Sequence, residues 1–212
     1  MSTDKREHID KREHILTEAE KLFAEKGFDG TSVRDIAHNA GVNLAMISYY
    51  FGSKEKLLES LIELRAGYTI GILEELNKDE SLSPWDKIER LVDYYVDKII
   101  TNLPFHNIMH QQSLNARSSE IKDLIMSIKL RNVEQVRKIF ADGEQKGIFR
   151  KIDMEMTMGT IMGTISQYTI SRDYGCRVLN IDRTHEETYR TELALRLKAH
   201  LKQLLRAHLG IK

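Results

Sequence analysis

The chain has 212 residues, and its 32 lysines and arginines balance 32 aspartates and glutamates, so the formal net charge is zero. Hydrophobic residues make up 41% and charged residues 30% of the sequence, which is typical of a globular protein and too apolar for a disordered one. The single cysteine excludes a disulfide framework within the chain. The neutral charge argues against a protein that coats nucleic acids or anionic membranes, but it does not exclude local recognition of DNA.

The N-terminal sequence MSTDKREHID lacks the apolar core that a secretory signal requires. The longest uncharged run, residues 156–171, is too short and too rich in Thr, Ser and Gln to span a bilayer. We therefore expect a cytoplasmic protein without a membrane partner. The lone Cys176 fits a reducing compartment.

The first part of the chain predicts four helices. Apolar residues at helical spacing run up to Gly27, a residue that suits the left-handed end of a helix. Ser32, followed three residues later by Asp35, is typical of a helix start, and Asn43 can cap another. The predicted helices cover about 15–26, 33–39, 43–50 and 53–76.

Longer amphipathic helices follow residues 79–84. Asp153 is expected to cap a Met-rich helix and Thr184 the last helix. No stretch shows sustained alternation of apolar and polar residues between turn signals, so no strand is expected. We predict an all-α protein of about nine helices, with a helix-turn-helix domain of three helices at 1–65 and a larger helical domain at 66–212.

Residues 33–50 show the pattern of a helix-turn-helix unit, in which the second helix can lie in the major groove of DNA. The small side chains of Ala37 and Ala40 allow the two helices to pack closely, and Ile47 holds the second helix against the first. The side chains expected to point outward are Asn43, Leu44, Ala45, Met46, Ser48, Tyr49 and Tyr50.

Residues 27–62, GFDGTSVRDIAHNAGVNLAMISYYFGSKEKLLESLI, resemble the DNA-binding domain of the TetR family of transcriptional regulators. The phrases TSVRDIA, AGV and YYFGSKEKLL match that family in order and spacing. The resemblance covers about residues 10–65. The rest of the chain resembles the family in its helical layout and in the phrase GIFRKID at 147–153.

The resemblance implies a role for each matching position. Thr31 and Ser32 would hold a phosphate at the start of the second helix, and Lys54 would contact another phosphate. Arg34 would lie beside the DNA backbone or a groove edge. The base-reading positions are occupied by Asn43, Leu44, Ala45, Met46 and Ser48, and the phosphate and sugar positions by Tyr49 and Tyr50.

The predicted reading face is poor in charged and bidentate groups. Ser48 stands where many family members have Tyr, and Leu44 and Met46 stand where polar residues are common. Contacts with thymine methyl groups, together with Asn43, would therefore carry much of the direct readout. Residues 1–65 hold 10 lysines and arginines against 12 acidic residues, which predicts weak non-specific binding and a shallow salt dependence.

Other kinds of chemistry have little support. His106 and His110 are four residues apart, but no Glu or Cys completes a metal motif, so we expect no metal site. A structural thiol is a better interpretation of Cys176 than a redox sensor. The sequence has no nucleophile with its base, no phosphate-binding loop and no cofactor motif, so we predict neither an enzyme nor a cofactor. It stays open whether Tyr49 or Tyr50 packs partly in the core.

The helical domain is expected to bind a small, mainly apolar molecule. Methionines of the Met-rich helix fill either the core or an adaptable pocket. From their positions, the expected pocket residues are Tyr95, Phe105, Met109, Met158, Met162, Gln167 and Tyr168.

The last helix carries a long leucine stripe, and Gly159 and Gly163 precede it at a spacing that permits close helix approach. In the family, these two helices pair with their copies in a four-helix bundle. The alternative, that both helices bury these faces within their own chain, stays open. The expected dimer contacts are Gly163, Tyr189, Leu193, Leu197 and Leu201.

The resemblance implies a homodimeric, sequence-specific DNA-binding transcriptional regulator. We expect a repressor that a small, mainly apolar ligand releases from a palindromic operator. Its partners would be double-stranded DNA, a small-molecule effector and a second copy of the chain. The alternative is a helical interaction or ligand-binding protein whose DNA-binding unit is vestigial.

Overall fold

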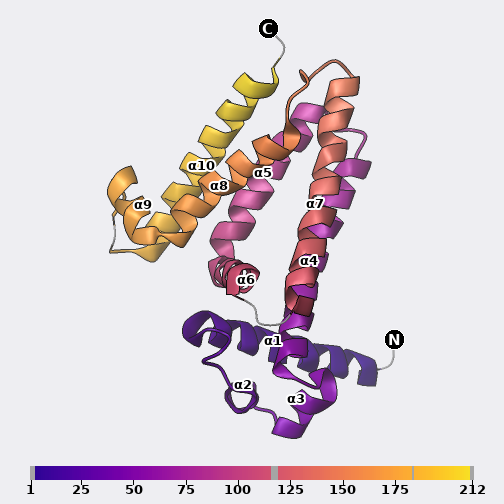
Figure 1. Cartoon of the computed structure of the whole chain (residues 1–212), viewed down its shortest axis with the longest axis vertical. Coiled ribbons are helices and arrows are strands. Elements are labelled where there is room, and N and C mark those ends of the chain that lie inside the picture. Colours follow the sequence, from indigo (N-terminus) through magenta and orange to yellow (C-terminus); the bar gives the residue numbers. More distant parts are fainter. Residues whose placement is uncertain (1–2, 116–118, 183, 211–212) are drawn as a thin grey trace. The chain divides into compact units, whose positions relative to one another are not determined.

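The computed structural model describes residues 3–115, 119–182 and 184–210, and within these residues it has ten helices and no strand (Figure 1). This confirms the all-α prediction. The helices are α1 (Thr3–Lys26), α2 (Val33–Asn39), α3 (Leu44–Phe51), α4 (Lys54–Lys78), α5 (Pro84–Thr101), α6 (Leu103–Asn115), α7 (Ser119–Gln145), α8 (Met154–Ile170), α9 (Arg172–Leu179) and α10 (Glu186–Leu209). In the part of the chain described, no helix is both long and apolar enough to cross a membrane.

The helix missing from the expected set is α9. It has only eight residues, and its N-cap residue, Ser171, makes no side-chain capping bond. Asn180 ends the helix in the left-handed conformation, with φ at 54°. The expected cap at Thr184 is also corrected: the Thr184 hydroxyl bonds to the carboxylate of Asp182, and α10 begins after His185.

The chain packs as two compact units. The first comprises Met1–Thr69 with Pro104–Leu130, and the second comprises Ile70–Leu103 with Arg131–Lys212. The long helices α4 and α7 each contribute a part to both units. Helix α6 and the first half of α7 belong with the N-terminal helices, while the domain limits expected from the sequence stay a prediction.

The core of the first unit gathers apolar side chains from six helices. Figure 1 shows α2 and α3 side by side next to α1, which is the arrangement of a helix-turn-helix unit. A buried ion pair joins α1 to α4: Arg65 Nε donates to Glu20 Oε2 at 3.0 Å, and the Glu20 side chain is only 7% exposed. Completely buried members of this core are Ile15, Leu16, Ile36, Leu57, Leu58, Leu61 and Ile62.

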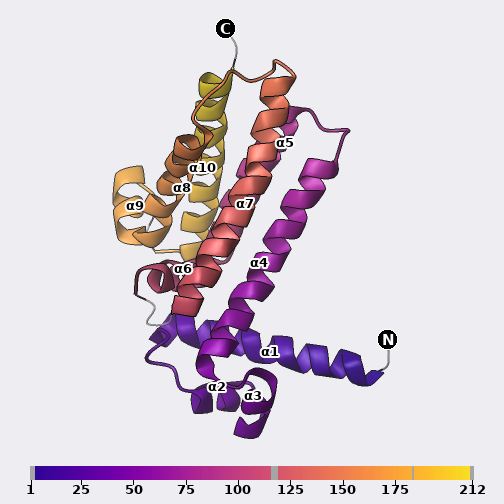
Figure 2. The ribbon, with the colours of Figure 1, turned by 45° about the vertical axis from the view of Figure 1, so that its right-hand side comes forward.

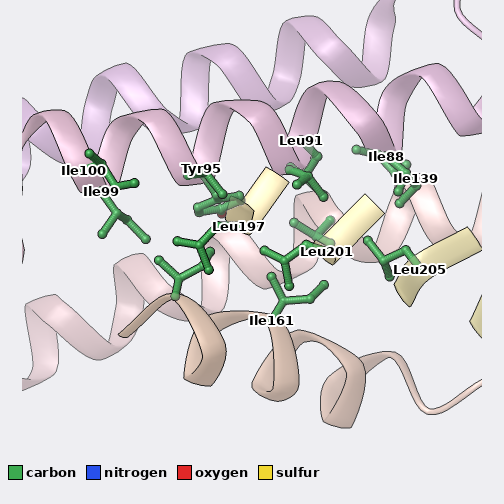
Figure 3. Close-up of a cluster of buried hydrophobic side chains, with 14 of the residues drawn as sticks. Ile88, Leu91, Tyr95, Ile99, Ile100, Ile139, Ile161, Leu197, Leu201 and Leu205 are labelled. Carbon is green, nitrogen blue, oxygen red and sulfur yellow. The ribbon is translucent and has the colours of Figure 1, made fainter. Parts of the chain in front are cut away.

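The core of the second unit lies mainly between α5 and α10. Figure 3 shows Ile88, Leu91 and Tyr95 of α5 directed toward Leu197, Leu201 and Leu205 of α10, with Ile161 of α8 beside them. Ion pairs border this contact, with Lys202 Nζ 2.7 Å from Asp93 and Lys198 Nζ 2.6 Å from Asp97. Arg206 pairs with Glu89 one turn further along both helices.

Two glycines of the second unit allow close packing. A Cβ atom at Gly143 of α7 would overlap the ring of Phe149, and one at Gly175 of α9 would overlap the hydroxyl of Tyr189. That hydroxyl donates to the carbonyl oxygen of Tyr168 at 2.5 Å. Tyr189 thus holds α10 to the end of α8, and α9 packs against its ring. Figure 2 shows the same three helices from a second side.

Candidate nucleic-acid interface

The start of α2 is fixed by a capping box. The Ser32 hydroxyl oxygen accepts a hydrogen bond from the Asp35 backbone N–H at 3.1 Å, and the Asp35 carboxylate accepts one from the Ser32 backbone N–H at 2.9 Å. The Ser32 hydroxyl also donates to the Asp35 carboxylate at 2.6 Å, and this bond, together with the one from the Ser32 N–H, holds the pKa of Asp35 below its usual value. Ser32 and the neighbouring Arg34 are exposed, so this helix end lies open to a partner. The helix start predicted from Ser32 and Asp35 is therefore confirmed.

The turn between α2 and α3 places α3 at a fixed angle. Gly41 has φ at 63°, a conformation that suits glycine, and the Val42 N–H donates to the Ala37 carbonyl oxygen at 3.0 Å. The Asn43 side chain then caps α3, because its Oδ1 accepts from the Met46 N–H at 2.9 Å.

Helix α3 buries one side and exposes the other. Ile47 and Phe51 pack in the core, and the guanidinium of Arg12 lies 5.2 Å from the centre of the Phe51 ring. On the opposite side, Leu44 is 41% and Tyr49 76% exposed. Exposed with them are Asn43, Ala45 and Ser48, while Met46 and Tyr50 are half-buried. The outward surface of α3 is therefore formed by Leu44, Ala45, Ser48 and Tyr49, and Tyr50 is the tyrosine that packs partly against the core.

Thr31 has a structural role in this arrangement. Its side chain is fully buried, and its hydroxyl donates to the carbonyl oxygens of Gly27 at 2.8 Å and Leu22 at 3.2 Å. The expectation that this hydroxyl holds a phosphate is corrected, because it is engaged inside the protein. The residue next to it, Ser32, keeps an exposed position.

Lys54 is half-buried at the start of α4. Its ammonium group donates to the carbonyl oxygens of Phe28 at 2.8 Å and Thr31 at 2.9 Å. Two of the three ammonium protons thus hold the segment between α1 and α2, and the ammonium group also lies over the Phe28 ring. Sequence reasoning missed this second role, since it depends on contacts between residues more than twenty positions apart.

Comparison with known proteins shows the family to which the chain belongs. Residues 15–61 match the profile described as bacterial regulatory proteins of the tetR family, and residues 84–198 match the profile described as the tetracyclin repressor-like C-terminal domain. The chain belongs to the TetR family of transcriptional regulators.

Individual TetR-family relatives are moderately similar. The HTH-type transcriptional repressor NicS of Pseudomonas putida is 34% identical over 151 residues, which is 66% of this chain and 66% of NicS. The matched segment thus spans just under two thirds of that relative. A crystal structure of the TetR-family regulator PfmR from Thermus thermophilus has a TM-score of 0.69 at 24% identity, over 100% of this chain and 98% of PfmR.

A further TetR-family structure contains a ligand. FadR from Bacillus subtilis, solved in complex with stearoyl-CoA, has a TM-score of 0.66 at 25% identity, over 91% of this chain and 96% of FadR.

The pocket residues expected from their positions in the sequence fall into both units. Phe105 and Met109 lie in the first unit, in or against its core. In the second unit, Tyr95 is buried, and its burial raises the pKa of its hydroxyl. Met158, Met162 and Tyr168 are half-buried, whereas Gln167 is exposed. The structure brings Tyr95 and Met158 together around a cavity of about 10 Å³, which is room for a single water molecule.

The expected dimer contacts are corrected in part. Tyr189, Leu193, Leu197 and Leu201 are at most 3% exposed, and all four pack in the core of their own chain. The leucine stripe of α10 is therefore a core stripe, which is the alternative that the sequence left open. Gly163 is exposed on the outward side of α8. It stays a candidate for contact with a second copy.

The remaining candidates have ordinary surroundings. His110 is exposed and His106 half-buried on α6, and Cys176 is buried in the core of the second unit. Among the residues that the structure describes, no group of three His, Cys, Asp or Glu side chains is placed to hold a metal ion.

Proposed function

We propose that the protein is a homodimeric, sequence-specific DNA-binding repressor that a small molecule releases from its operator. The observation that carries the proposal is the outward surface of α3. An eight-residue helix, capped by Asn43 and held by Ile47 and Phe51, exposes a large tyrosine and a leucine to solvent. Packing gives no reason for this exposure, whereas a partner in the major groove does.

The character of this surface favours a particular mode of recognition. Tyr49 and Ser48 offer hydroxyl groups to phosphates and base edges, and Leu44 offers an apolar contact to thymine methyl groups. The capping box uses the N–H groups of Ser32 and Asp35, so those of Val33 and Arg34 are the ones left at this exposed helix end for a phosphate. Arg34 and the ammonium group of Lys54 supply the positive charge. With so few cations, we expect a shallow dependence of affinity on salt.

Two-fold symmetry would complete the reading unit. Two copies of α3, about 34–36 Å apart, fit successive major grooves and therefore a palindromic operator. The exposed side of α8, which includes Gly163, is our candidate for the contact between the copies. Symmetric pairing of one patch with itself is the commonest form of protein dimer.

Ligand control is proposed from the family. NicS is named a repressor, and FadR was solved with stearoyl-CoA bound. In this chain, a ligand that prefers a conformation with misplaced reading helices would shift the population away from DNA. The alternative, a ligand-binding protein with a vestigial DNA-binding unit, predicts no sequence-specific binding. We also propose that the protein works in the cytoplasm and without enzymatic activity.

Fluorescence anisotropy with DNA from the region upstream of the protein's own gene tests the proposal. We expect specific binding by the wild type at low salt, in competition with unrelated DNA. Tyr49→Ala should weaken that binding about tenfold, the effect of one lost hydrogen bond with its packing. Tyr174→Ala is the matched control, because Tyr174 is an exposed tyrosine on α9. If the wild type shows no specific binding, the proposal fails, and equal binding by Tyr49→Ala would refute the assigned face.

A further inference from the structure

A cavity of about 270 Å³ lies in the second unit between α8, the end of α9 and α10. Its apolar wall is formed by Leu179, Leu193 and Leu197, with the ring of Tyr168 beside them. Leu193 and Leu197 reach the cavity from the core, where they are 2% and 3% exposed. A molecule that entered here would therefore bury an apolar part against packed side chains.

The polar side of this cavity is cationic. Arg196 and His200 follow one another by one turn of α10, and no acidic residue lines the cavity. Arg196 Nη1 donates to the carbonyl oxygen of Leu179 at 2.6 Å, which fixes the guanidinium plane at the cavity. Within the described residues, no carboxylate lies within 4.0 Å of this guanidinium. The rest of its N–H groups can thus bind an anion from outside the chain.

The other cavities of this unit are less suitable. The space around Tyr95 and Met158 holds one water at most. A wider groove at the other end of α10 contains Arg150 and His208, but the acidic side chain of Asp153 also lines it and would repel an anion. Of these three, the cavity at Arg196 is the one that combines an apolar wall with a positioned cation and has no acidic residue among its lining side chains.

We propose that this cavity binds a small monocarboxylate with a short aliphatic or aromatic tail. The carboxylate would bind Arg196 and His200, and the tail would lie among Leu179, Leu193 and Leu197. Pockets for drug-sized molecules measure about 300–1,000 Å³, so a cavity of about 270 Å³ accepts a smaller molecule. As an effector site it rests on the proposed function, but as a binding site it is independent of DNA.

The position of the cavity would allow a bound molecule to influence dimer contacts. Thr164, which lines it, adjoins Gly163 on the exposed side of α8. A bound molecule would therefore change the surface that we assign to the second copy. Because Arg196 is exposed, solvent screens its charge, and we expect a dissociation constant near the millimolar range.

Isothermal titration calorimetry of the full chain with hexanoate, without DNA, tests the site. Wild type should bind one hexanoate per chain, and 1-hexanol, which has the same tail without the charge, should bind at least about tenfold more weakly. Arg196→Gln should weaken hexanoate binding by a similar factor. Thr164→Phe should abolish it by filling the cavity. Arg177→Gln is the matched control, since Arg177 is exposed on α9 and does not line the cavity.

Circular dichroism and thermal unfolding of each variant establish that it is folded. The site is refuted if wild type takes up no hexanoate at millimolar concentration, if 1-hexanol binds equally well, or if Arg196→Gln binds like wild type. Hexanoate binding by a protein that recognises no operator would leave this site standing and overturn only the proposed regulator.

Discussion

The ammonium group of Lys54 lies 4.3 Å from the centre of the Phe28 ring and donates a hydrogen bond to the carbonyl oxygen of that same residue. Together with its bond to Thr31, this contact ties the start of α4 to the segment that leads into α2. A lysine at a position expected to contact phosphate thus also shapes the interface. A substitution of Lys54 therefore has to be tested for its effect on stability and for its effect on DNA affinity.

We expect Lys54→Met to lower both the stability and the DNA affinity of the protein. Two hydrogen bonds from a charged donor and a cation–π contact would be lost, at a cost of about 2 kcal/mol in the free energy of unfolding. Urea denaturation measures this cost. Lys56→Met is the control, because Lys56 is exposed and pairs only with Glu59 on the same helix. A Lys54→Met protein as stable as wild type would contradict the structural role of this lysine.

The Glu20–Arg65 pair predicts a larger effect. Glu20→Ala leaves the guanidinium of Arg65 in a largely buried position without its carboxylate. Removal of one partner of a buried pair typically costs about 3–5 kcal/mol, and the 30% exposure of the Arg65 side chain places the expected loss at the lower limit, about 3 kcal/mol. Glu18→Ala, which breaks an exposed pair with Lys21, should change stability by less than about 0.5 kcal/mol. Equal denaturation midpoints for the two variants would show that burial of the Glu20–Arg65 pair does not increase its contribution to stability.

Because Gly143 is closely packed, the addition of one methyl group there should lower the stability of the protein. Gly143→Ala forces the ring of Phe149 out of its place, and overpacking of this kind costs about 1–3 kcal/mol. Gly71→Ala on α4 is the matched control, because no atom lies within 4 Å of the added Cβ. It should stabilise the helix by about 0.5–1 kcal/mol. Differential scanning calorimetry should show the two melting temperatures shifted in opposite directions, and shifts of the same sign would count against the described packing.

Apolar burial, rather than ion pairing, is expected to hold α10 on α5. Leu201→Ala should lower the free energy of unfolding by about 2–5 kcal/mol, because Leu201 is fully buried. The adjacent Lys202→Met, which breaks the ion pair with Asp93, should cost less than about 1 kcal/mol. Guanidinium denaturation of the two variants decides the order. A larger loss in Lys202→Met would mean that the ion pairs dominate this contact.

Lys98 predicts a dependence of stability on pH. Burial lowers the pKa of Lys98 from 10.5 to about 8. Between these values the folded state has lost the proton that the unfolded state still binds, so the stability of the wild type should rise as pH increases through this window. Below pH 8 both states are protonated, and the full cost of the buried charge is present. Lys98→Met should therefore be more stable than wild type near neutral pH, and the difference should shrink as pH rises. A difference independent of pH would contradict the lowered pKa.

Local signals made most of the N-terminal unit predictable. The residues Ser32, Asp35 and Asn43 act within three positions of their partners, so their spacing in the sequence is also their spacing in space. The same is true of Gly41, whose left-handed conformation depends only on the turn. The exposed side of α3 followed from these caps and from the apolar positions that remain.

Long-range packing decided what the sequence could not. The leucines of α10 would look the same whether they faced α5 or a second copy, and only the fold assigns them to α5. The sequence suggests that Thr31 lies at a helix start. Its hydroxyl instead donates to the carbonyl oxygen of Gly27, because the end of α1 lies beside it. Helix α9 has eight residues and no long apolar stripe, because its buried residues are Gly175 and Cys176 and its side-chain contacts are made mainly by Tyr174 and Leu179.

The cap at Asn43 limits what the protein can read. Its side-chain oxygen already accepts the Met46 N–H, so one of its two lone pairs is used and the helix start holds the amide in one orientation. The paired contact to adenine needs a donor and an acceptor from the same amide in one plane with the base, and an amide held by the helix start favours contact through its N–H groups instead. The base opposite Asn43 in the operator should therefore present an acceptor at the groove edge, such as guanine O6 or thymine O4. The role of Asn43 as a helix cap would thus limit the set of bases that this position can recognise.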